Sequence, residues 1–110
     1  MKDDKVFLLH IRDAIQNILS YTTNGQQAFL SDSKTQDAVI RNLEIIGEAS
    51  KKISETFKSN NPSIPWKPMS GMRDKLIHDY FSVNLEIIWN VVEQELPRLS
   101  EKLAAILNQT

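Results

Sequence analysis

Residues 32–58 read DSKTQDAVIRNLEIIGEASKKISETFK, and this stretch decides the fold class. Its apolar residues recur at steps of threes and fours, the period of a helix that buries one face. These residues are Val39, Leu43, Ile46, Ile53 and Phe57. Asp32 and Ser33 precede the run, and both residue types commonly cap the N-terminus of a helix. We therefore predict one long amphipathic helix from about residue 32 to about residue 58.

A patch of small side chains lies in the middle of this predicted helix, formed by Gly47, Ala49 and Ser50. Glycine inside a helix costs about 1 kcal/mol relative to alanine. The expected compensation is the close approach of another helix.

The flanking segments also carry helical patterns. Lys5 to about Thr22 has a wide apolar stripe, and the turn signal Asn24-Gly25 ends it. Residues 60–68 hold three of the four prolines, so we predict a rigid connector there. A short helix from about Met69 to Asp79 follows.

Two further helices are predicted near the C-terminus. Asn84 (or Ser82) is a suitable cap for a helix from Leu85 to Leu96, and Pro97 suits the first turn of a helix from Arg98 to Asn108. The prediction is an all-α fold, an up-and-down bundle of four long helices and one short helix, in a single domain that spans residues 1–110.

Composition narrows the function classes. The 110 residues include no cysteine, which excludes disulfides, thiolate metal sites and thiol catalysis. No apolar run approaches the roughly 20 residues that cross a membrane, so a soluble cytoplasmic protein is expected. The net charge of −1 disfavours a broad electrostatic nucleic-acid binder but leaves room for a small local phosphate site.

The strongest chemical signal is residues 71–81, GMRDKLIHDYF, which bring Arg73, His78 and Tyr80 together. Arginine binds phosphate oxygens and keeps its charge, while histidine exchanges a proton near neutral pH. These two groups suffice in principle to cleave a phosphodiester. On a straight helix, residues five apart lie about 140° around the axis and about 7.5 Å along it. Arg73 and His78 therefore converge only if the helix loosens or two subunits contribute, and the alternative is an ordinary solvated or packed pair.

Several blocks of the sequence, in this order and spacing, resemble the HepT-like branch of the HEPN superfamily, ribonuclease toxins of type II toxin–antitoxin systems. The blocks are DAVIRNLEIIGEA at residues 37–49, Ile64-Pro65-Trp66, residues 71–81, Trp89 and Leu96-Pro97. The resemblance implies a HEPN-type bundle and a homodimer whose active cleft lies at the subunit interface. It also implies a metal-independent endoribonuclease without a cofactor, paired with a minimal nucleotidyltransferase antitoxin.

Carried onto this chain, the resemblance makes Arg73 and His78 the catalytic pair. His78 would move protons to and from the reacting oxygens, and Arg73 would hold the scissile phosphate. A ribose 2′-OH as nucleophile makes RNA the expected substrate, with transfer RNA as one candidate.

Tyr80 has a second implied role, as the tyrosine to which the antitoxin adds AMP. An added phosphate beside Arg73 and His78 would occupy the place of the substrate phosphate. A half-buried tyrosine with a solvated hydroxyl is the alternative. Asp74 and Asp79 either orient the pair or balance surface charge, and Glu48 is a candidate partner for Arg73.

Other chemically interesting residues have simpler interpretations. We expect a packed or interface role for His10, a core or interface role for Trp66 and Trp89, and a solvated side chain for Arg41. Glu44 and Glu48 have the i, i+4 spacing of metal ligands, but no second histidine supports them, and no metal site is expected.

Three function classes follow. The first is the ribonuclease toxin, which needs Arg73 and His78 for activity. The second is a catalytically silent nucleotide-binding or scaffolding partner of a nucleotidyltransferase, and the third is a plain helical dimerisation module. The intact Arg, His and Tyr favour the toxin.

Overall fold

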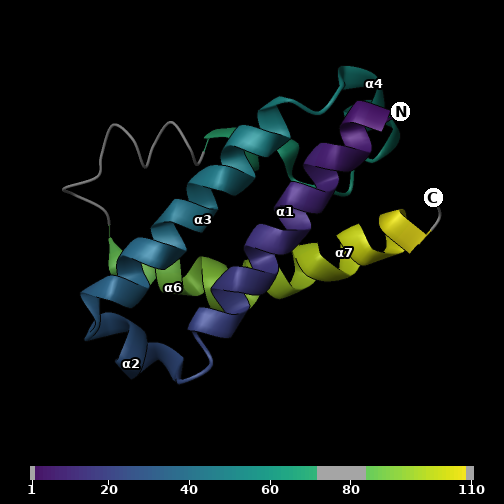
Figure 1. Ribbon diagram of the computed structural model, residues 1–110. Coiled ribbons are helices and arrows are strands. Elements are labelled where there is room, and N and C mark those ends of the chain that lie inside the picture. Colours follow the sequence, from purple (N-terminus) through teal and green to yellow (C-terminus); the bar gives the residue numbers. More distant parts are fainter. Residues whose placement is uncertain (1, 72–83, 109–110) are drawn as a thin grey trace.

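The computed structural model describes residues 2–71 and 84–108, and every regular element in these ranges is helical (Figure 1). The all-α prediction is therefore confirmed. The elements are α1 (Lys2–Tyr21), α2 (Gly25–Leu30), α3 (Ser33–Lys51), α4 (Glu55–Asn60), α6 (Leu85–Asn90), a π-helical turn (Val91–Glu95) and α7 (Leu96–Asn108). Residues 66–71 are also helical.

The core is built on the contact between α1 and α3, which run side by side in opposite directions (Figure 1). The continuous α6–α7 helix crosses behind this pair, with α7 packed on α1 and α6 packed on α2. The predicted apolar face of α3 is confirmed, because Val39, Leu43 and Ile46 are all buried. The small residues Gly47, Ala49 and Ser50 are buried as well.

No helix within the described ranges is long and apolar enough to cross a membrane.

Helix α2 was not predicted. Gly25 begins it with φ of +90°, a conformation that favours glycine, so the Asn24-Gly25 turn is confirmed. Phe29 anchors α2, with only 1% of its surface exposed and its ring centroid 5.5 Å from that of Trp89. Asp32 then caps α3 as predicted, since its carboxylate accepts a hydrogen bond from the backbone N–H of Lys34.

The predicted end of the long helix at Lys58 is wrong, because α3 ends at Lys51. The buried carboxylate of Asp4 accepts hydrogen bonds from the backbone N–H of Ser54 (2.8 Å) and from its hydroxyl (2.7 Å). The same hydroxyl oxygen accepts from the N–H of Phe57 and so caps α4. This group of contacts, the Asp4–Ser54 clamp, holds the start of α1 against the break between α3 and α4.

The predicted division between Leu96 and Arg98 is also wrong. Helix α6 continues through the π-helical turn into α7 without a break, with Pro97 as the second residue of α7. A proline ring clashes with the carbonyl four residues earlier in a regular α-helix. The wider π turn directly before Leu96 relieves this clash, so the chain continues as a helix. The predicted cap is confirmed, because the Asn84 side chain accepts from the N–H groups of Glu86 and Ile87.

Candidate functional site

The five motif residues predicted to carry chemistry lie outside the described residues, in the range 72–83. They are Arg73, Asp74, His78, Asp79 and Tyr80. The structure shows instead how the chain is held on either side of this range, at residues 66–70 and at residue 84.

The N-terminal end is fixed by packing and hydrogen bonds. Trp66 is buried, its indole N–H donates to the carbonyl of Asn61 (3.0 Å), and its ring meets that of Phe57 edge to face. Met69 reaches the core, and the hydroxyls of Ser70 and Ser50 lie 3.1 Å apart. The described helix starts at Trp66, so the predicted connector at residues 60–68 ends earlier than expected, and the predicted start of the short helix at Met69 is three residues too late. Residues 66–71 are tied to α3 through Ser70 and Ser50.

The C-terminal end is fixed by Asn84. Its side chain caps α6, and four residues later Ile88 is buried in the core. Fixed residues therefore bracket the motif on both sides.

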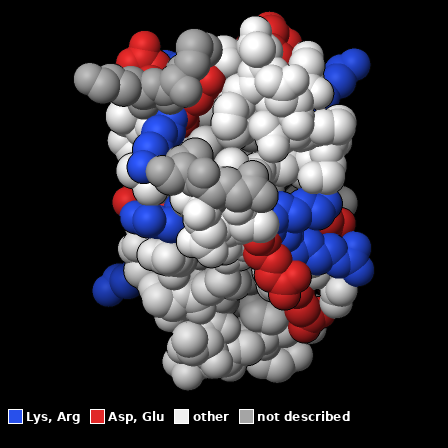
Figure 2. Space-filling model, turned by 90° about the vertical axis from the view of Figure 1, so that its right-hand side faces the viewer, with Lys and Arg blue, Asp and Glu red and all other residues white. Residues whose placement is uncertain are grey.

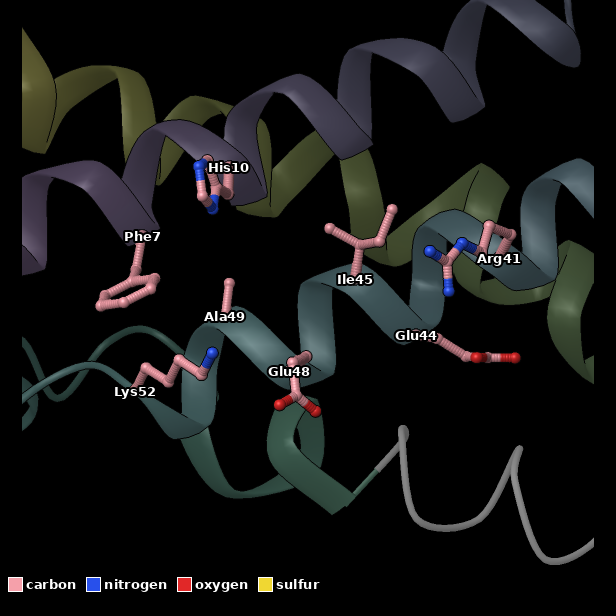
Figure 3. A pocket seen from close by; sticks show the side chains of 8 residues that line it. All are labelled: Phe7, His10, Arg41, Glu44, Ile45, Glu48, Ala49 and Lys52. Atoms are coloured by element: carbon pink, nitrogen blue, oxygen red, sulfur yellow. The ribbon is translucent and has the colours of Figure 1, made fainter.

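Glu48 is the one predicted site residue that lies within the described part. It is half-buried on α3, and its predicted contact with Arg73 involves a residue outside that part. Glu48 borders a groove of about 490 Å³ between α1 and α3, which we call the α1–α3 groove. The lining residues are Phe7, His10, Arg41, Glu44, Ile45, Glu48, Ala49 and Lys52 (Figure 3).

The side chains of the α1–α3 groove separate by charge. In Figure 3 the carboxylate of Glu48 points away from α1 and that of Glu44 extends along α3, whereas the ammonium group of Lys52 points toward α1. The Lys52 nitrogen lies 5.6 Å from the centre of the Phe7 ring, within the range of a cation–π contact. The side of the groove that faces α1 is therefore aromatic, apolar and cationic.

His10 contributes a second ring to this wall. It was predicted to be packed or at an interface, but in the single chain it is exposed and meets Phe7 edge to face at 6.0 Å. Trp66 and Trp89 are both buried, which confirms their core role, and Arg41 is exposed as predicted. Sequence reasoning treated His10 and Arg41 separately and missed the groove, because only the pairing of α1 with α3 brings them together.

Charges of both signs mix on the face of the molecule shown in Figure 2, without a continuous basic surface. Among the described residues, no group of three or more histidine or acidic side chains is placed to hold a metal ion. The carboxyl pair Glu44 and Glu48 thus gains no third ligand from the part of the chain that the structure describes.

Comparisons with known proteins agree with the motif. The family description "Ribonuclease HepT-like" matches residues 11–106. The "Probable ribonuclease HepT" of Thermococcus cleftensis is 48% identical over 102 residues, which cover 92% of this chain and 93% of that protein. "Putative RNase MJ0127" of Methanocaldococcus jannaschii is 44% identical over 107 residues, which cover 96% of this chain and 88% of that protein.

A third relative matches over almost its whole length. "Putative RNase TTE0752" of Caldanaerobacter subterraneus is 37% identical over 110 residues, which cover 99% of this chain and 98% of that protein. No solved structure matches the chain significantly. The match to most of the chain, with the Arg73 and His78 motif inside it, shows that this protein belongs to the HepT-like ribonuclease family.

Proposed function

We propose that this protein is a metal-independent endoribonuclease, the toxin of a type II toxin–antitoxin system, and that it works as a homodimer in the cytoplasm. The observation that carries the proposal is the intact Arg73-x4-His78-x-Tyr80 sequence inside a family match that spans residues 11–106. The ribonuclease names of the relatives support RNA as the substrate.

The proposed reaction is a transesterification within the RNA chain. A ribose 2′-OH attacks the adjacent phosphorus, a 2′,3′-cyclic phosphate forms, and the bond to the 5′-oxygen of the next nucleotide breaks. A His78 imidazole accepts the 2′-OH proton, and a His78 imidazolium returns a proton to the leaving 5′-oxygen. Arg73 binds the non-bridging oxygens and offsets the charge that develops on them.

The homodimer has a chemical rationale. Two histidines are needed if the acid and the base act in the same step, and each chain supplies a single His78. A two-fold axis through the cleft places both copies at one site. Asp74, Asp79 and Glu48 are proposed to orient the arginine and imidazole side chains, and the domain is proposed to comprise the whole of residues 1–110.

Tyr80 is the proposed point of control. Addition of AMP to its hydroxyl by a nucleotidyltransferase antitoxin places a phosphate two residues from His78. Arg73 would then pair with that phosphate, and substrate RNA would be excluded by charge and by volume.

RNA cleavage in EDTA by purified protein tests the proposal, with His78→Ala and Arg73→Ala as inactive variants. Circular dichroism confirms that all three proteins are folded, and mass spectrometry confirms that Tyr80 carries no AMP. We expect cleavage by the parent alone. Absence of cleavage by the unmodified parent, on transfer RNA and on total RNA, would favour a silent nucleotidyltransferase partner.

A further inference from the structure

The α1–α3 groove is built like a binding site for a single-stranded nucleotide chain. Its wall on α1 presents the rings of Phe7 and His10, and its floor on α3 presents Ile45 and Ala49 (Figure 3). Single-stranded RNA is bound in this way elsewhere, because bases stack on aromatic or apolar side chains while cations follow the phosphates.

Two cations flank the apolar part of the groove. Arg41 lies beyond Ile45, at the opposite end of the floor from Lys52 (Figure 3). Lys52 follows Arg41 by eleven positions, which correspond to about 16 Å along a helix axis. Among the described residues, neither cation has a carboxylate within 4 Å, whereas Arg12 is paired with Asp13. Within the described part of the chain, both cations therefore lack a carboxylate counter-charge that a phosphate would have to displace.

The nearby carboxylates do not cancel this pattern. Glu48 points away from α1 and Glu44 extends along α3, so an RNA strand lying against Phe7 would meet Lys52 before either carboxylate (Figure 3). A purely apolar helix from a protein partner would instead leave Arg41 and Lys52 without counter-charges. The chemistry of the groove thus favours a ligand with planar apolar bodies and regularly spaced negative charges.

We propose that the α1–α3 groove binds a single-stranded part of the RNA substrate outside the scissile phosphate, with a base on Phe7 and phosphates on Arg41 and Lys52. This inference rests on the proposed ribonuclease function. The groove binds and positions RNA, and its residues take no part in bond cleavage.

Binding is measured with the His78→Ala protein, which holds RNA without cutting it, and a fluorescently labelled single-stranded 12-mer of mixed sequence. Arg41→Gln/Lys52→Gln is compared with Lys34→Gln/Arg98→Gln, which removes two exposed charges elsewhere. For single strands the slope of log affinity against log salt changes by about 0.7 per phosphate contact. We expect the slope to fall by about 1.4 in the groove variant, with no change in the control.

Phe7 is tested by a second pair of variants. Phe7→Ala removes the stacking surface, and we expect affinity to fall about 5-fold or more. Because Phe7 also packs against the core, Phe7→Leu provides a variant that retains apolar bulk while losing the aromatic face. It should fold normally and still bind RNA more weakly than the parent.

If every groove variant keeps the RNA affinity and the salt slope of the parent, the inference is wrong. The ribonuclease proposal then still stands, provided that the wild type cleaves RNA. Failure of the wild type to cleave RNA and of His78→Ala to bind it would overturn both. Light scattering on each variant detects a third outcome. If loss of RNA binding accompanies conversion of a dimer to a monomer, the groove is a contact between subunits and the inference is wrong.

Discussion

Replacing Asp4 with alanine should destabilise the protein strongly, although Asp4 lies far from the motif in the sequence. Asp4 is 3% exposed, and its carboxylate accepts from the backbone N–H and the hydroxyl of Ser54. Asp4→Ala removes both hydrogen bonds and leaves the half-buried Ser54 N–H without an acceptor. Hydrogen bonds to a charged group contribute about 1.5–3 kcal/mol each, and an orphaned buried donor costs about 1–3 kcal/mol.

These contributions overlap, so we expect a loss of about 2–4 kcal/mol in the free energy of unfolding. For a domain of this size that loss corresponds to a fall in Tm of roughly 9–17 °C. Urea unfolding followed by circular dichroism measures the free energy directly. Asp3→Ala is the matched control, because Asp3 occupies the same helical turn but is exposed.

The control separates the Asp4–Ser54 clamp from a general effect of charge at the start of α1. Either aspartate interacts favourably with the helix dipole, by about 0.3–1 kcal/mol. If Asp4→Ala costs no more than Asp3→Ala, the clamp does not stabilise the break between α3 and α4, and the explanation for the end of α3 is wrong.

Two other perturbations test the fold. Phe29→Ala should cost about 3–5 kcal/mol in urea unfolding, since the ring is buried against Trp89; a loss below 1 kcal/mol would show that α2 is not part of the core. The Asp32 carboxylate has its pKa lowered below the usual 3.8, first by the hydrogen bond from the Thr35 hydroxyl and then by that from the Lys34 N–H. The contribution of the ionised Asp32 carboxylate to stability is therefore present above pH 3.8 and is lost as the pH falls through the lower pKa of the folded state. The difference in free energy of unfolding between wild type and Asp32→Asn should shrink over that pH range. A difference that does not change with pH would contradict this assignment.

The helical class and much of the core follow from the sequence because they depend on local period. Val39, Leu43 and Ile46 repeat with the period of one helix face, and all three are buried. The period did not reveal the end of α3, because Ile53 continues the apolar pattern and is buried. It nevertheless lies beyond Lys51, the last residue of α3. The break depends on Asp4, fifty residues away, and a local pattern carries no information about that contact.

The α1–α3 groove was missed for a related reason. In the sequence, Phe7 and His10 on α1 carry no signal of a binding site. The same is true of Arg41 on α3 and of Lys52, which directly follows α3. Their combination exists only after the two helices pack. The motif shows the opposite case, because Arg73 and His78 were identified from residue type and from the family resemblance of the surrounding sequence, and they stay predictions whose geometry lies outside the described residues.

The most direct test of the central claim is the chemistry of the cleaved ends. An RNA that the purified protein cuts is resynthesised with a single 2′-deoxyribose at the cleaved position, and both versions are incubated with the protein in EDTA. We predict a 2′,3′-cyclic phosphate and a 5′-hydroxyl from the all-ribose RNA, no cut at the deoxyribose, and no products with His78→Ala. Cleavage at the deoxyribose, or cleavage that survives His78→Ala, would contradict a His78-centred attack by the 2′-OH.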